Sequence, residues 1–293
     1  MAAFETYQAR ADSRRAKVLA ATTSPFTIEV LFLGGLNARQ RAAFTDAADR
    51  WTRIIVGDLP SVLVDNSVID DILILAQGVS IDGKGGILGQ AGPTHIRPPS
   101  ASAAAFLPAK GIMSFDTADL ATMQTAGTLN DVITHEMGHV LGIGTLWEHK
   151  GLLKRAGSPN PTFAGAGAMD EYRELRGTGR RRRVPVENTG GPGTRDGHWR
   201  ETVFRNELMS GFIANPGNPL SRMTAASLGD LGYQVDVDAG EPYELPDLLD
   251  LAEAGALVAH AAPIDGGTVL PVIPMVLPSD SLTTRSQRRR RDR

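Results

Sequence analysis

Alternating and helical hydrophobic patterns predict a strand followed by a helix near the start of the chain. Every second residue is apolar over Phe26–Phe32, which is typical of a strand with one buried face. Apolar side chains then recur at helical spacing over residues 37–56. Asn37, with Gln40 three residues later, favours a capping box at the start of this helix, and Gly57 favours its end.

Two short apolar runs predict further strands. Residues 72–76 form an unbroken apolar run between acidic residues and a glycine, which indicates a buried strand, and residues 110–115 predict another. Glycines and prolines crowd together between them, over residues 83–99, and favour an ordered loop or irregular strands over a helix.

A second helix is predicted over Leu129–Leu141. Thr128 and Asp131 have the spacing of a capping box, and Gly142 follows the last apolar residue as a stop signal. The periodicity therefore predicts a helix with defined ends, on which the chemistry described below is placed.

The second half of the chain is less regular. Residues 157–193 are rich in Gly, Pro and Arg and predict a long surface excursion, whereas residues 198–212 resume order and residues 223–231 predict a short helix. Residues 247–258 suggest an amphipathic helix. Beyond it, residues 269–277 are apolar but interrupted by prolines, so we expect them to lie along the body as a strap.

Composition sets limits on the function. Hydrophobic residues make up 42% of the 293 residues and charged residues 22%, which is ordinary for a globular protein with a sizeable core. The absence of cysteine excludes disulfides, cysteine-ligated zinc and thiol nucleophiles. The formal net charge is −3 although it includes two arginine runs, Arg180–Arg183 and Arg288–Arg291, so the rest of the chain is acidic and disfavours nucleic-acid binding. We expect the first run to be a solvated loop and the basic end to be disordered.

Neither a signal peptide nor a membrane anchor is expected from the sequence. Residues 1–17 contain no apolar core of a signal peptide, and no later stretch reaches the ~20 apolar residues of a membrane span. We therefore expect no transmembrane segment, and either a cytoplasmic location or export by a non-classical route.

The predicted helix at 129–141 carries the motif His135-Glu136-Met137-Gly138-His139. Histidines at i and i+4 project from one face of a helix, where their imidazoles can hold one cation at the ~2.0–2.1 Å of zinc–nitrogen bonds. Glu136 follows the first histidine directly, so it can accept a proton from the attacking water and pass it to the leaving amine. This pattern marks zinc peptidases, and Gly142 stands where metzincins have a turn glycine.

A catalytic zinc needs a third protein ligand. The compact metzincin pattern would place it at position 145, which is a threonine here. Four histidines remain as alternatives: His95, His149, His198 and His260. Of these, His198 is followed eleven residues later by Met209, which is the metzincin order of a late ligand before a methionine-bearing turn.

With these residues the chain resembles leishmanolysin-type metzincins. The resemblance rests on the run from His135 to Gly142, then on Gly197-His198-Trp199 and Glu207-Leu208-Met209-Ser210 after a long insertion. It implies one catalytic zinc bound by His135, His139 and His198, with Glu136 as the general base and Met209 as the floor of the site. Trp147 and Trp199 are expected to support the site, and Glu207 to orient a histidine. The eukaryotic members are cysteine-rich and secreted or surface-anchored, so this cysteine-free chain looks more like a bacterial relative.

The resemblance implies an α+β fold: a metzincin-like zincin with a sheet-bearing N-terminal subdomain, a central zinc helix and an irregular C-terminal subdomain. We expect an N-terminal extension over residues 1–24, the peptidase domain over 25–245, and a C-terminal extension with a disordered basic end over 246–293. An extended peptide substrate is expected to pair with an exposed edge strand at Gly111–Phe115.

The predicted function is that of a zinc-dependent metalloendopeptidase acting on proteins or peptides, with no nucleic-acid partner. The alternative is a non-catalytic peptide-binding or adhesion protein on the same scaffold, against which Glu136 argues, because binding alone needs no base. Five aspartates could contribute to a structural calcium site, although no EF-hand spacing supports one: Asp65, Asp70, Asp71, Asp116 and Asp119. The sequence leaves the substrate and the oligomeric state open.

Overall fold

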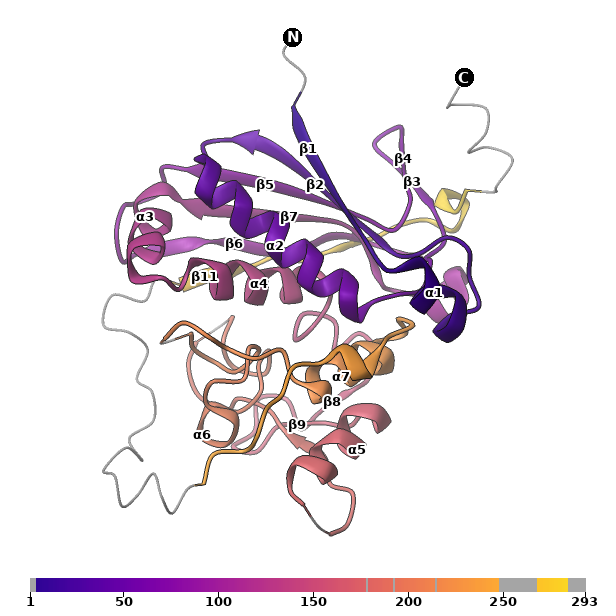
Figure 1. Cartoon of the computed structure of the whole chain (residues 1–293), viewed down its shortest axis with the longest axis vertical. Helices are drawn as coiled ribbons and strands as arrows, with labels where there is room; N and C mark the ends of the chain where they lie inside the picture. Colours follow the sequence, from indigo (N-terminus) through magenta and orange to yellow (C-terminus); the bar gives the residue numbers. More distant parts are fainter. Residues whose placement is uncertain (1–3, 178, 192, 214, 248–267, 284–293) are drawn as a thin grey trace.

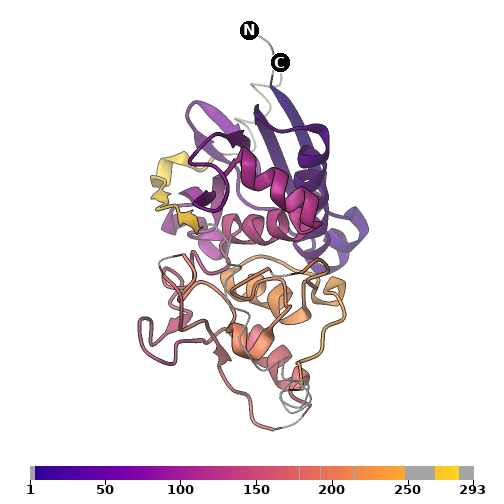
Figure 2. The same ribbon diagram turned by 90° about the vertical axis from the view of Figure 1, so that its left-hand side faces the viewer.

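The computed structural model describes residues 4–177, 179–191, 193–213, 215–247 and 268–283. Figure 1 shows a sheet-bearing upper part, with helices on one face, above a lower part of short helices and long loops, and the turned view in Figure 2 agrees. The α+β class expected from the sequence is therefore observed. The helix that carries the two motif histidines lies at the boundary between the two parts.

The upper part is built on a seven-stranded sheet in the order β1-β2-β5-β7-β6-β11, with β12 also paired to β6. Its strands are β1 (Glu5–Arg10), β2 (Thr27–Gly34), β5 (Ile72–Val79), β6 (Ile87–Ile96), β7 (Pro108–Asp116), β11 (Thr268–Pro271) and β12 (Met275–Val276). β2, β5 and β7 run parallel to one another, whereas β1 and β6 are antiparallel to their neighbours β2 and β7. The strands predicted at 26–32, 72–76 and 110–115 are confirmed, each within two or three residues at its ends.

Two long helices cover the sheet on one face. α2 (Ala38–Ile54) packs against α4 (Leu129–Val140) and contacts β1 and β2, while α4 contacts β6 and β7. The capping box of Asn37 and Gln40 is confirmed, because each side chain bonds the other's backbone amide. The apolar stripe of α2 ends at Ile55, whose backbone is already extended, so the helix ends before the predicted stop at Gly57.

The start of α4 corrects the sequence prediction. Thr128 is the N-cap, but its backbone is helical and its side chain makes no capping hydrogen bond. Asp131 instead accepts hydrogen bonds from the Gly217 amide and the Asn218 side chain. The stop at Gly142 is confirmed, since this glycine has a φ of +108°, which side-chain-bearing residues rarely adopt.

The expectation that Gly111–Phe115 is an exposed edge strand is wrong. β7 pairs with β5 on one side and with β6 on the other, so its backbone groups are used on both sides. The glycine- and proline-rich stretch before it forms β6, a ten-residue strand whose register shifts next to Pro93. β6 would be the edge strand after β7, but β11 and β12 of the C-terminal segment pair with its outer side.

The lower part follows α4 in the chain. It contains α5 (Ala166–Leu175), α6 (Glu201–Phe204), α7 (Arg222–Leu231) and a small sheet of β8 (Leu153–Lys154), β9 (Thr162–Phe163) and β10 (Val184–Pro185). α7 confirms the helix predicted at 223–231. The stretch predicted as a surface excursion contains α5, which packs against α7, and the exposed loop of Arg180–Arg183, where Arg181 pairs with Asp170.

The remaining elements are short. They are α1 (Ser13–Leu19), α3 (Thr117–Ala126), the hairpin of β3 (Val62–Val64) and β4 (Ser67–Ile69), and three 3-10 turns at Pro99–Ala104, Val237–Ala239 and Ser279–Ser281. The segment expected as an N-terminal extension thus supplies β1 and α1. The amphipathic helix suggested at 247–258 and the basic end fall almost entirely outside the described residues. Among the described helices none has the length and apolarity needed to cross a bilayer.

The segment of residues 268–277, here termed the C-terminal strap, lies along the body as the sequence predicts. It comprises β11, β12 and the residues between and just after them, and all of its pairing is with β6. Leu277 is its one buried apolar side chain, 6% exposed, in a small cluster with Val62 and Ala109.

Candidate metal centre

α4 presents His135, Glu136 and His139 on the surface that faces the lower part of the molecule. All three side chains are buried, as are the apolar residues of the same helix. His198 comes from a loop of the lower part and is equally buried. The fold therefore brings together residues that lie 63 positions apart in the chain.

The Nε2 atoms of His135, His139 and His198 converge on one point, at 2.9 to 3.0 Å from one another. Zinc–nitrogen bonds of ~2.0–2.1 Å place ligand nitrogens roughly 3 to 3.5 Å apart. These three residues also form a group whose ligand atoms could hold a metal ion together. The spacing of the three nitrogens fits one small divalent cation.

The opposite ring nitrogens fix the tautomer of each histidine. The Nδ1 atom of His135 bonds the Leu208 carbonyl at 2.7 Å, that of His139 bonds the Ile143 carbonyl at 2.9 Å, and that of His198 bonds the Thr194 carbonyl at 2.8 Å. A carbonyl oxygen only accepts, so each Nδ1 carries the proton and each Nε2 of a neutral ring keeps its lone pair. Three lone pairs aimed at one point repel one another unless a cation binds them.

Electrostatics favour the same neutral form. Burial, reinforced by the neighbouring His139, lowers the pKa of His135 to about 3, and burial lowers the pKa of His139 to about 4. The pKa of His198 is held well below its usual value by burial and then by the other two histidines. Neutral imidazole is the form that binds a metal.

Glu136 is the one acidic side chain next to this cluster on the helix. Its Oε2 atom is buried and has no hydrogen-bond partner in the part of the chain that the structure describes, and burial raises the pKa of this carboxyl to about 8. A buried carboxylate oxygen with no partner is costly, and a nearby cation or a water molecule would offset the cost. Burial therefore favours the protonated form of the Glu136 carboxyl.

Met209 packs directly beneath the zinc-motif helix. A Cβ atom at Gly138 would lie 2.8 Å from the Met209 sulfur and 2.9 Å from the Trp51 ring, so a larger residue at this position of the motif would force one of these side chains to shift. The Trp51 indole is fixed in turn by its hydrogen bond to the Thr134 carbonyl. Met209 is fully buried.

Glu207 has a different role from the one expected, since none of its hydrogen bonds to the described residues is with a histidine. Its Oε2 accepts from the Met209 amide at 2.7 Å, and its Oε1 accepts from the Ser221 amide and hydroxyl and from the Thr224 hydroxyl. The Thr224 hydroxyl accepts from the indole N–H of Trp199, the residue after His198. Glu207 thus joins the turn of Met209 to the strand-like segment that carries the third histidine.

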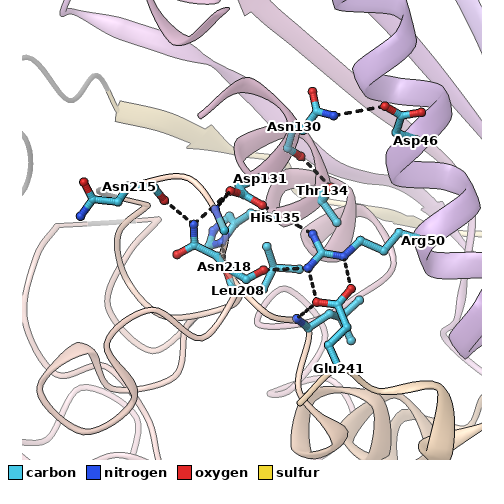
Figure 3. A network of polar contacts seen from close by, with 12 residues as sticks. Asp46, Arg50, Asn130, Asp131, Thr134, His135, Leu208, Asn215, Asn218 and Glu241 are labelled. Carbon is cyan, nitrogen blue, oxygen red and sulfur yellow. Dashed lines mark hydrogen bonds and ion pairs between the residues drawn. The ribbon is translucent and has the colours of Figure 1, made fainter. Parts of the chain in front are cut away.

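A second polar network connects the two parts of the molecule next to the site (Figure 3). Arg50 of α2 pairs with Glu241, bonds the Asn218 carbonyl and lies 3.6 Å from Asp131 at the start of α4. The loop held by Asp131 continues to Pro219, whose carbonyl accepts from the Leu208 amide, and the Leu208 carbonyl accepts from His135. The sequence analysis missed these positioning groups, because Arg50 resembles any polar helix residue and a backbone carbonyl leaves no sequence signal.

The other candidate histidines that the structure describes, His95 and His149, do not belong to the cluster. The His149 ring lies 6.0 Å from that of Phe106, His95 is on β6, and His260 is outside the described residues. Trp147 and Trp199 are buried and pack against each other, with ring centroids 4.7 Å apart. Thr145, at the position of the compact third ligand, donates to the His139 carbonyl.

Two of the five candidate calcium aspartates come together, Asp70 and Asp71, with Asp58 as a third member. The Asp71 carboxylate accepts hydrogen bonds from Leu59 and Thr27, and Asp116 accepts from Ile81 and Ala118. The Asp71 and Asp116 carboxylates thus each hold backbone groups of the fold. We assign no calcium to either of them.

The region that contains the three histidines matches a known protein family. The family model of leishmanolysin matches residues 101–243, which span α4, the His198 loop and the turn of Met209. This region is leishmanolysin-like. The match indicates a metallopeptidase, and therefore a protein or peptide substrate. No curated protein matches the chain.

Proposed function

We propose that the protein is a zinc-dependent metalloendopeptidase with the architecture of a metzincin. His135, His139 and His198 would hold the zinc ion, which when bound polarises a scissile carbonyl and makes water a stronger acid. The observation that carries the proposal is the convergence of three Nε2 lone pairs, each fixed by a backbone carbonyl at the opposite nitrogen.

Glu136 supplies the acid–base function in this proposal. Its carboxylate accepts a proton from the attacking water at Oε2, the atom that has no hydrogen-bond partner among the described residues. It then passes this proton to the amine of the leaving peptide. Met209 and the Glu207 network keep the histidines in place while the proton moves.

Replacing Glu136 with glutamine tests the proposal. Glu136→Gln keeps the size of the side chain and all three histidines, so we expect about one bound zinc per chain, as in the wild type. General acid–base catalysis contributes typically about 10²–10⁴-fold, and casein hydrolysis should fall by that factor. Zinc content is measured by metal analysis, and hydrolysis with and without a chelator.

Glu148→Gln is the matched control, because Glu148 is an exposed glutamate of the same sequence region and should be dispensable. Near wild-type turnover in Glu136→Gln would refute Glu136 as the base. A wild-type protein that binds zinc but hydrolyses nothing would favour the non-catalytic peptide-binding alternative.

A further inference from the structure

The outer edge of β6 is filled by the chain itself. The C-terminal strap runs parallel to β6 in the register Val269 to Gly89, Leu270 to Gln90 and Met275 to His95. The Thr268 amide bonds the Gly86 carbonyl at 2.9 Å, and the Leu277 amide bonds the Ile96 carbonyl at 2.9 Å. An open strand edge is a template for an extended peptide, and here a segment of the same chain takes that place.

The strap lies between β6 and the loop that positions the third histidine. On one side β6 is packed against α4, the helix of His135 and His139. On the other side, a Cβ at Gly193 would lie 2.9 Å from the Val269 carbonyl oxygen. Gly193 adjoins Thr194, whose carbonyl fixes His198. β11 therefore touches both an element next to the metal-binding helix and the loop of the third histidine.

The strap is held by its backbone more than by its side chains. Leu270 is 40% exposed, Met275 60% and Ile273 93%, and Leu277 at the far end is the buried anchor. Main-chain pairing with few buried side chains is the way in which sheets bind extended peptides of varied sequence. Val269 is partly buried against the main core, so an incoming peptide would have to replace the main-chain pairing and the contact of this one side chain.

We propose that the strap is an intramolecular occupant of the peptide-binding edge, and that substrate must displace its β11 half from β6. The β12 half remains anchored through Leu277. This proposal rests on the proposed peptidase function for its consequence: the full chain is held in a low-activity state until β11 leaves the edge. The ligand class of the edge is an extended polypeptide, bound through its main chain.

A reversible lock tests this proposal in the zinc-loaded full chain. Since the chain has no cysteine, the double variant Gln90→Cys/Leu270→Cys places a unique pair at facing positions of β6 and β11. Oxidation, verified by mass spectrometry, fixes β11 on the edge, and a phosphine reductant that spares zinc releases it. An occupant of the edge reduces the apparent affinity for substrate in proportion to the fraction of molecules whose edge is free. The oxidised form should therefore show a kcat/KM on a casein-derived peptide that is at least about tenfold lower than that of the reduced form.

A loosening variant should act in the opposite direction. Thr268→Pro removes the amide that bonds Gly86 and should raise kcat/KM above that of the wild type. Ile273→Ser, in the unpaired and exposed middle of the strap, is the control and should change nothing. The two single-cysteine variants control for the substitutions themselves.

Binding separates this proposal from the peptidase function. A labelled casein peptide is titrated into the same lock variant carrying Glu136→Gln, and fluorescence anisotropy is measured in the oxidised and reduced forms. Weaker binding in the oxidised form supports occupancy of the edge even if no peptide is ever cleaved, in which case the peptidase proposal alone fails. Equal binding and equal activity in the two forms would overturn the strap proposal.

Discussion

Glu207 is a buried carboxylate that is connected to the histidine cluster through other groups. It holds the Met209 amide directly and reaches Trp199 through the Thr224 hydroxyl. The Trp199 amide in turn bonds the Met209 carbonyl at 2.9 Å. One side chain thus fixes the floor of the site and the residue next to the third histidine, so its charge and its acceptor geometry both matter.

We predict that Glu207→Gln weakens zinc binding as well as the fold. Glutamine replaces one acceptor oxygen by a donor, which leaves buried N–H or O–H groups unpaired, at a cost of about 1–3 kcal/mol in the free energy of unfolding. Mutation of a group that orients a metal ligand typically lowers metal affinity by about 10–100-fold. Competition with a chromophoric zinc chelator measures the affinity, and denaturant titration measures the stability.

Asp71→Asn provides the matched control, because Asp71 is also a buried carboxylate with several donors but lies away from the histidines. It should lower stability and leave zinc affinity unchanged. Equal losses of zinc affinity in both variants would mean that Glu207 acts only through general stability.

The elements that position the site differ in how well their sequence reveals them. α2 and α4 could be predicted because their apolar residues have a clear helical periodicity. The shared face of His135 and His139 could also be predicted, because it follows from their i, i+4 spacing on a helix. His198 could be predicted only through the order of motifs along the chain. Its contact with the helix depends on the loop held by Thr194.

The error about the edge of the sheet has a physical reason. A short apolar run such as that of β7 indicates a buried strand but does not state which strands flank it. Its neighbour β6 was hidden by glycines, of which Gly89 is required because a Cβ there would lie 2.3 Å from the Ser114 carbonyl oxygen. The strands that cover β6 come from residues 268–276, far away in sequence, and a local pattern cannot reveal such pairing.

Gly138 shows how one helix position couples the motif to the floor of the site. Alanine there would favour the helix by about 1 kcal/mol. Its Cβ would, however, meet both Met209 and Trp51 at less than 3.0 Å. Overpacking of a core typically costs about 1–3 kcal/mol, so we predict that Gly138→Ala lowers the melting temperature and weakens zinc binding.

The comparison for this prediction is Gly229→Ala in α7, where the nearest neighbour of the new Cβ would be a Val235 methyl at 3.2 Å. That variant should be close to neutral in thermal unfolding and in zinc affinity. If Gly138→Ala were as stable as the wild type and bound zinc equally well, the close packing of Met209 under the helix would have no energetic consequence.

The three histidines come from two parts of the molecule that share one hydrophobic core. His135 and His139 belong to the helix under the sheet, and His198 belongs to the lower part (Figure 1). Arg50 with Glu241, and the Tyr233 hydroxyl on the Leu141 carbonyl, make further connections. A cation bound by all three histidines would add a cross-link that the unfolded chain lacks.

We therefore predict that removing zinc lowers the stability of the whole chain. A ligand present at about a thousand times its Kd stabilises the folded state by about 4 kcal/mol, which corresponds to a melting temperature higher by roughly 10 °C for a chain of this size. Calorimetry of the zinc-loaded and chelator-treated protein measures this difference. His198→Ala should abolish it, because the cross-link then loses its ligand in the lower part, whereas His149→Ala should preserve it, since His149 lies against Phe106 and outside the cluster. A zinc-dependent shift that persisted in His198→Ala but vanished in His149→Ala would reassign the third ligand and, with it, the way in which metal binding holds the two parts together.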